Sequence, residues 1–160
     1  MGPIFLFDTW LMPELIEVVV DDLPEGIIGG TAQLPKHGCG FASDGGLPGV
    51  VSKTGSQIEG TLITSLSDVS WDRMTYVASV WGLVPKTVQI SFEHKQISAT
   101  TFAVLNPKDN ASLSEAPAHT DDVFTAMLPD TIREVIGYYG TIPAPDLRSR
   151  LHMILGRASA

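Results

Sequence analysis

Ile4-Phe5-Leu6-Phe7-Asp8-Thr9-Trp10-Leu11 sets the expected architecture of this 160-residue chain, because a short apolar run ends there at a polar pair. Four successive apolar residues, 4–7, are typical of a buried strand. Pro13 suits the first turn of a helix. Apolar residues recur around it at helical spacing, at Leu11, Leu15, Val18 and Val19. We therefore expect a strand and a turn, then a helix that closes at Pro24 and Gly26.

Most of the following sequence, up to residue 105, favours strands. They are predicted over four segments: Thr31–Leu34, Gln57–Ile63, Thr87–Phe92 and Ile97–Leu105. The last two form a hairpin with Glu93 and His94 at a solvated tip, and Glu59 is expected to face outward. A helix over Asp68–Val77, capped by Ser67 or Asp68, precedes that hairpin. Residues 38–56 contain six glycines. We expect a loop-rich segment there, with room for one short strand over 49–52.

The C-terminal third changes character. Residues 106–120 are polar and indicate a linker. Thr131 and Glu134 form a capping box for a helix that ends at Gly140. A second helix starts at Pro145, and its apolar stripe comprises Leu147, Leu151, Ile154 and Leu155. We predict a single α+β unit in which 106–160 is a linker with helices packed on residues 1–105.

Composition and charge exclude several classes of protein. Ten basic against eighteen acidic residues give a net charge of −8, so the chain lacks the basic footprint of a nucleic-acid binder or of a protein attracted to anionic membranes. Residues 1–72 carry all of this excess. The N-terminus has no basic leader, and no apolar run is long enough to span a bilayer. A single cysteine, Cys39, suits a reducing compartment, so we expect a soluble cytoplasmic protein.

Motifs for metal or cofactor chemistry are not found. The four histidines (His37, His94, His119 and His152) are not spaced like metal ligands, so we expect no metal and no cofactor. The sequence holds no nucleophile elbow and no glycine-rich phosphate loop. Cys39 follows His37 closely, which allows a reactive thiol, but a buried free cysteine is the expectation.

The order of these segments resembles the γ-glutamylcyclotransferase-like family over residues 4–105. The residues that carry the resemblance are Phe7-Asp8-Thr9-Trp10-Leu11, Ala32 and Leu34, Gly46-Leu47-Pro48, Ile58-Glu59-Gly60-Thr61-Leu62, Trp71-Asp72-Arg73-Met74, Val88–Ile90 and Thr101–Leu105. The resemblance implies a small β-barrel with short helices. It also implies a cavity beside the first loop, which in the family holds a γ-glutamyl group through backbone N–H groups.

On this resemblance the ligand-binding positions are Phe7, Asp8, Thr9, Trp10 and Leu11, with Pro48 and Tyr76 lining the cavity. Two of them depart from the family. Asp8 stands at a glycine position, where it adds a side chain and a negative charge. Trp10 is bulkier than the residue it replaces. Both changes argue against the usual ligand.

The family's general acid/base glutamate has no counterpart. The matching stretch Met74-Thr75-Tyr76-Val77-Ala78 places Ala78 at that position, and residues 60–92 contain no glutamate in any register. Alanine cannot move the proton that cyclisation requires. Asp72 could substitute only if it pointed into the cavity, so we expect no catalytic residue.

Two functions follow from the resemblance. We expect a catalytically degenerate module that binds a small γ-glutamyl-like ligand or a protein. The alternative is an active enzyme that releases 5-oxoproline from a γ-glutamyl amine, and an unrelated β-rich domain is a third interpretation. The stretches Thr131–Gly140 and Pro143–Arg157 also resemble the segment that precedes a Nudix ADP-ribose pyrophosphatase domain in bacterial proteins associated with tellurite resistance. This resemblance implies a Nudix domain as a partner.

Overall fold

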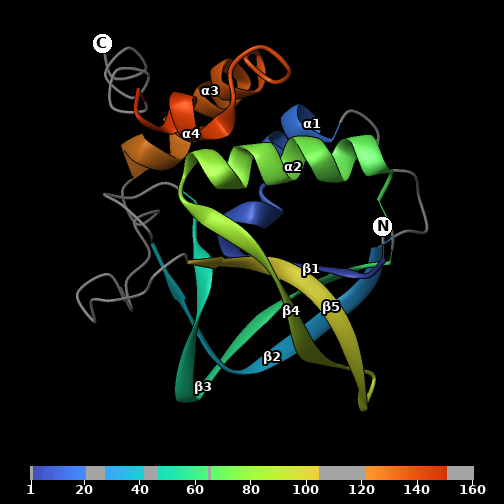
Figure 1. Cartoon of the computed structure of the whole chain (residues 1–160). Helices are drawn as coiled ribbons and strands as arrows, with labels where there is room; N and C mark the ends of the chain where they lie inside the picture. The colour runs from blue at the N-terminus through green and yellow to red at the C-terminus, as the bar shows by residue number, and fades with distance from the viewer. Residues whose placement is uncertain (1, 21–27, 42–46, 65, 105–121, 151–160) are drawn as a thin grey trace.

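The computed structural model describes residues 2–20, 28–41, 47–64, 66–104 and 122–150. Five strands form one sheet, and Figure 1 shows the helices gathered at one end of it. In chain order the elements are β1 (Ile4–Phe7), the 3-10 helix η1 (Asp8–Leu11), α1 (Pro13–Val19), β2 (Ile28–Gly40), β3 (Gly49–Ile63), α2 (Asp68–Val80), β4 (Leu83–Phe92), β5 (Lys95–Val104), α3 (Asp122–Ile136) and α4 (Ala144–Arg148). The chain therefore has the α+β class that the sequence predicts.

The sheet curls into a barrel in the order β1-β3-β2-β4-β5. Its long ladders are antiparallel: β1 with β3, β2 with β3, and β4 with β5. Three seams are narrow, since β1 meets β5 only at Ile4–Thr100, β3 meets β5 only at Val50–Ala103, and β2 meets β4 only at Gln33–Ser91. The Thr101 hydroxyl strengthens one seam by donating to the Phe5 carbonyl at 2.8 Å. The barrel is thus closed, but weakly at its seams.

The loop expected over 38–56 is shorter than predicted. The short strand expected over 49–52 is confirmed as the start of β3, which pairs there with residues 37–40 of β2. Strand β2 runs on to Gly40 and β3 begins at Gly49, so the two form one long hairpin. Residues 53–56 lie outside the paired registers on β3, where Gly55 adopts a φ of 84°. Glycines in this segment therefore permit a bend within a strand and do not end it.

Two glycines of β3 stand where another backbone passes too closely for a side chain. A Cβ on Gly60 would lie 2.4 Å from the Leu6 carbonyl oxygen of β1, and one on Gly49 would lie 2.8 Å from the Val104 nitrogen of β5. Close approach of this kind is a known reason for glycine inside a strand. Gly60 thus permits the close β1–β3 ladder, and Gly49 permits the β3–β5 seam.

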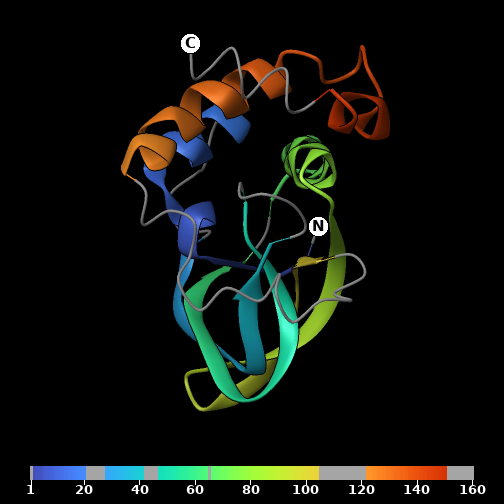
Figure 2. The ribbon, with the colours of Figure 1, turned by 90° about the vertical axis from the view of Figure 1, so that its left-hand side faces the viewer.

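The helices form a layer over one end of the barrel, which Figure 2 shows after a quarter turn. Ser67 caps α2 as predicted, because its hydroxyl accepts from the Ser70 amide at 3.1 Å. Arg73 on α2 ties α1 to this layer: its guanidinium donates to the carbonyls of Val19 at 2.9 Å and Val18 at 3.0 Å. These bonds satisfy carbonyls at the C-terminus of α1, where intrahelical partners end.

The predicted start of the C-terminal helix is wrong. Helix α3 begins at Asp122, runs through Pro129 and ends at Ile136, so Thr131 lies inside it and is buried. Its buried residues Leu128, Ile132 and Val135 join the same core cluster as those of α1. Tertiary packing therefore extends the helix upstream of the capping-box pattern. Helix α4 starts as predicted, with Pro145 in its first turn, and the rest of its apolar stripe lies outside the described residues.

The turn between β4 and β5 stores backbone strain. Phe92 pairs with Lys95, and the two residues between them, Glu93 and His94, have φ of 50° and 65°. This is the geometry of a two-residue type I′ turn, which favours Asn-Gly. Glutamate is poorly suited to this backbone, and histidine, which tolerates it better, is still less suited than glycine.

Replacing the turn pair by Glu93→Asn with His94→Gly should raise the free energy of unfolding by about 1 kcal/mol, because strain is relieved. Urea unfolding followed by circular dichroism measures the change. Glu93→Ala with His94→Ala is the matched control and should not stabilise. Equal midpoints for wild type and the Asn-Gly variant would contradict the strain argument.

Candidate functional site

The loop after β1 is the first part of the candidate site. It folds as the 3-10 helix η1, whose first residue, Asp8, adopts a left-handed φ of 52°. Left-handed backbone favours glycine, and aspartate is among the residues that tolerate it best. The position that resembles a family glycine thus keeps a glycine-like backbone while carrying a half-buried carboxylate.

Trp10 occupies the space beside this loop. Its side chain is fully buried, and its indole nitrogen donates to the Pro48 carbonyl at 2.9 Å. The ring stacks on Phe102 of β5 at a centroid distance of 4.7 Å. Phe102 in turn stacks on Trp71 of α2 at 5.3 Å. The structure therefore brings Trp10 and Pro48 together, as expected, and fixes the indole in place.

Helix α2 presents an apolar face to the core. Its buried residues include Met74, Val77 and Ala78, and Ala78 has no exposed surface. The helix ends at Val80, and Trp81 follows as its C-terminal cap residue, 1% exposed. The Trp81 indole nitrogen and the Thr75 hydroxyl are buried without a hydrogen-bond partner among the described residues.

The side chains of Asp72 and Tyr76 contact the segment between α3 and α4. Asp72 is exposed and accepts a hydrogen bond from the Tyr139 hydroxyl, in the turn after α3. Tyr76 donates to the Ile142 carbonyl at 2.7 Å and meets the Tyr139 ring edge-on at 5.5 Å. The hydrogen bond to Asp72 raises the pKa of Tyr139. These contacts join α2 to the turn that precedes α4.

Cys39 lies on β2, close enough to the first loop for Asp8 to act on its charge. Burial, with a smaller contribution from the Asp8 carboxylate, raises the pKa of the Cys39 thiol to about 12. His37, which shares a face of β2 with Cys39, donates from Nδ1 to the Pro35 carbonyl at 2.8 Å. A thiol with its pKa raised this far is protonated at neutral pH. Cys39 is half-buried, so it is less buried than the sequence predicts.

We predict that Cys39 in the folded protein reacts with iodoacetamide far more slowly than a free thiol at pH 8, because the thiolate is the nucleophile. Asp8→Asn should speed the reaction, since it removes the negative charge that raises the pKa. Intact-mass spectrometry over time measures both rates. Labelling in urea is the control, and fast labelling of the folded wild type would overturn the prediction.

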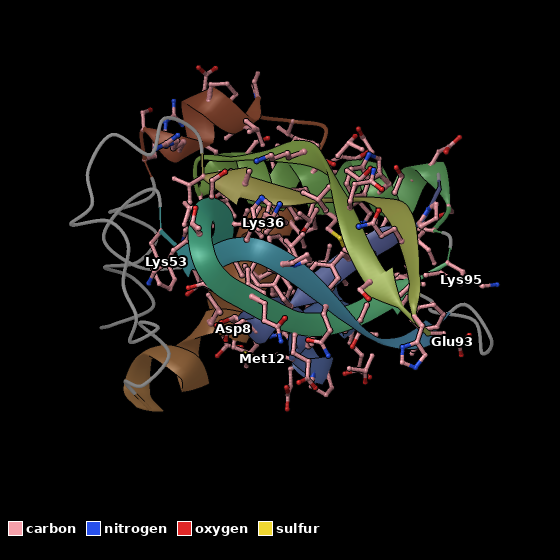
Figure 3. The ribbon with its side chains drawn as sticks, turned by 90° about the horizontal axis from the view of Figure 1, so that it is seen from below. Asp8, Met12, Lys36, Lys53, Glu93 and Lys95 are labelled. Atoms are coloured by element: carbon pink, nitrogen blue, oxygen red, sulfur yellow. The ribbon has the colours of Figure 1, made fainter. Side chains whose placement is uncertain are left out.

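The other acidic residues singled out from the sequence lie away from this loop. Glu59 is exposed on β3 while Ile58 and Gly60 are buried, which confirms its outward orientation. Glu93 lies at the β4–β5 turn, and Figure 3 shows it far from Asp8 and Met12. Within the described ranges no group of three His, Cys, Asp or Glu could hold a metal ion. No helix in that part of the chain is long and apolar enough to cross a membrane.

Sequence reasoning missed three aromatic residues at this site: Trp71, Phe102 and Trp81. Trp71 falls at the spacing that faces Met74 and Ala78 along α2, so helical periodicity alone could have placed it on the inner face. No local sequence pattern predicts the stacking of Trp71 on Phe102, because the two residues belong to segments far apart in the chain.

Comparisons with known proteins agree with this architecture. No family model and no curated protein matches the chain. Among solved structures, an Arabidopsis thaliana protein matches with a TM-score of 0.59 and 19% identity, over 89% of this chain and 94% of that one. A gamma-glutamyl cyclotransferase matches with a TM-score of 0.52 and 17% identity, over 65% of this chain and 66% of that one.

YkqA from Bacillus subtilis matches with a TM-score of 0.57 and 18% identity, over 89% of this chain and 56% of that one. At sequence identities this low, the matches show a shared fold alone. The barrel, the loop after β1 and the helix α2 beside it thus form a domain with the fold of gamma-glutamyl cyclotransferase.

Proposed function

We propose that this chain is a catalytically degenerate domain of the γ-glutamylcyclotransferase fold that acts as a binding module. One observation carries the proposal: the buried polar side chains of the described residues are threonines, Thr9, Thr101 and Thr131, and none is a carboxylate. Cyclisation of a γ-glutamyl amine needs a positioned base to take a proton from the attacking amine and return it to the leaving group.

The missing base does not depend on how the chain is aligned to the family. Ala78 is buried and has no titratable group, and Trp81, at the end of the same helix, has none near neutral pH. Asp72 is engaged by Tyr139 at the protein surface. Loss of a general base typically removes about 10²–10⁴ in rate.

The altered loop supports the same proposal. The buried Trp10 ring fills space beside the backbone that would approach a ligand, and its hydrogen bond to Pro48 holds it there. Asp8 adds negative charge, which opposes the carboxylate of a γ-glutamyl group.

A second candidate function rests on Asp8. It is a half-buried carboxylate in the loop itself, so an active enzyme would use Asp8 as the general base in place of the missing glutamate. In that case activity must depend on Asp8 and must be indifferent to Asp72.

The test is 5-oxoproline release from a panel of γ-glutamyl amines and dipeptides at high protein concentration. We expect no turnover above buffer for wild type, Asp8→Asn and Asp72→Asn alike, while an authentic gamma-glutamyl cyclotransferase turns over in the same assay. Turnover that is lost in Asp8→Asn would establish the second candidate. Turnover lost only in Asp72→Asn would show that Asp72 has taken the acid/base role.

The setting of this module is also a proposal. The free Cys39 thiol supports a reducing compartment such as the cytoplasm. The C-terminal resemblance to the segment before a Nudix domain supports a partner of that class, and much of that segment lies outside the described residues.

A further inference from the structure

Part of β4 is a free strand edge. In the β4–β5 ladder, Phe92 pairs with Lys95 across a two-residue turn, so Ser91, Gln89, Thr87 and Pro85 turn their backbone groups toward the other side. Ser91 confirms this alternation, because it pairs on that side with Gln33 of β2. The backbone groups of Thr87 and Gln89 have no ladder partner among the described residues.

Beside this edge, β2 departs from a regular strand. Pro35 has no amide hydrogen to donate, Lys36 adopts a left-handed φ of 63°, and the β2–β3 register shifts between Pro35 and His37. Each feature interrupts a regular strand. Among the described residues, the β2–β4 ladder consists of the pair Gln33–Ser91 and does not continue toward Pro85.

Lys86 lies on the face of β4 that is otherwise buried or half-buried. It pairs with Thr101 and shares a face of the ladder with Val88, Ile90 and Ala99, all of which are buried along with Thr101. Lys86 itself is exposed. A lysine on the buried face of a sheet can be exposed only where that face meets solvent.

We propose that the β4 edge over Pro85–Gln89 binds an extended acidic peptide of a partner protein, which adds a strand to the sheet and pairs a carboxylate with Lys86. Strand addition of this type takes its affinity from backbone hydrogen bonds and its specificity from alternate side chains. Thr87 and Gln89 supply the backbone groups, and Lys86 supplies the specificity. Val84, half-buried and on the same face as Lys86, suits an apolar peptide residue two positions from the acidic one.

Charge favours an acidic peptide over a second copy of this chain. Two copies paired antiparallel through Thr87 would bring both Lys86 side chains onto one face of the joined sheet, where like charges repel. The strands and the β4–β5 turn carry four lysines, Lys36, Lys53, Lys86 and Lys95, against two glutamates, Glu59 and Glu93. The barrel is thus net positive in a chain of net charge −8. Figure 3 shows Lys36 and Lys53 together on one side of the barrel.

This inference rests on the proposed function as a binding module. The test uses ¹⁵N–¹H NMR spectra of the whole chain with two blocked heptapeptides, Thr-Val-Thr-Glu-Thr-Val-Thr and the same sequence with lysine for glutamate. With the glutamate peptide we expect shifts centred on Thr87 and Gln89, together with slower hydrogen exchange of both amides. The lysine peptide should bind at least about tenfold more weakly.

A charge swap separates specific pairing from general attraction. Lys86→Glu should reverse the preference, so that the lysine peptide binds better, whereas Lys95→Glu near the hairpin tip should leave the preference unchanged. Absence of shifts up to millimolar peptide, or equal loss of binding in both variants, would overturn the edge site. Neither outcome decides whether the domain is catalytically degenerate. The 5-oxoproline assay tests that separately, and turnover in that assay would overturn the proposed function.

Discussion

Gly60→Ala should lower the free energy of unfolding by about 3 kcal/mol or more, a large effect for one added methyl group. The new Cβ would lie 2.4 Å from the Leu6 carbonyl oxygen and 2.6 Å from the Phe5 ring. Phe5 is fully buried and Leu6 belongs to the β1–β3 ladder, so neither can move without breaking strand pairing. Urea unfolding followed by tryptophan fluorescence measures the loss.

Gly2→Ala is the matched control, because a Cβ there meets nothing within 4 Å. Its unfolding midpoint should equal that of wild type. If Gly60→Ala also unfolded at the wild-type midpoint, the close approach of β1 to β3 would be refuted. Gly49→Ala tests the β3–β5 seam in the same way, since its Cβ would lie 2.8 Å from the Val104 nitrogen.

Trp10→Ala should destabilise the protein by about 3–5 kcal/mol. The substitution removes a fully buried ring, its stacking on Phe102 and its hydrogen bond to the Pro48 carbonyl. Trp10→Phe keeps an aromatic ring but cannot donate to Pro48, so its loss should be smaller, about 1–2 kcal/mol. Thermal and urea unfolding of the two variants separate packing from hydrogen bonding.

The comparison also bears on function. If the Trp10 ring occupies the space that a ligand fills in an active enzyme, Trp10→Ala should enlarge that space. It should still release no 5-oxoproline, because the substitution does not supply a general base. Turnover in Trp10→Ala would show that the ring blocks a competent site. Equal stability of Trp10→Ala and wild type would contradict the packing described for the loop.

Several site features were predictable from sequence, each for a local reason. The run 4–7 and its polar end predict β1 and the loop, and the structure confirms both. Alternation places Glu59 outward and Ile58 inward, as observed. The absence of glutamate from 60–92 is a fact of composition, so no folding is needed to establish it. That Ala78, Asp8 and Trp10 make the chain non-catalytic stays a prediction.

Other features depend on contacts between distant segments. Glycines at 38, 40 and 49 look like loop residues, but the partner strands keep them in β2 and β3. Thr131 looks like a helix start, but packing of Leu128 and Ile132 into the core extends α3 beyond it. Neighbouring strands and helices determine both outcomes, and local propensity is too weak to oppose them.

The sequence alone therefore determined the α+β class, the positions of β1, α2 and the β4–β5 hairpin, and the absence of glutamate from residues 60–92. These are properties of local period and composition. Only the tertiary structure decided that Trp10 stacks on Phe102 and donates to the Pro48 carbonyl, that Asp72 accepts a hydrogen bond from Tyr139, and that Gln33 of β2 pairs with Ser91 of β4. Each of these depends on which strand lies beside which, and barrel closure sets that arrangement across the whole chain.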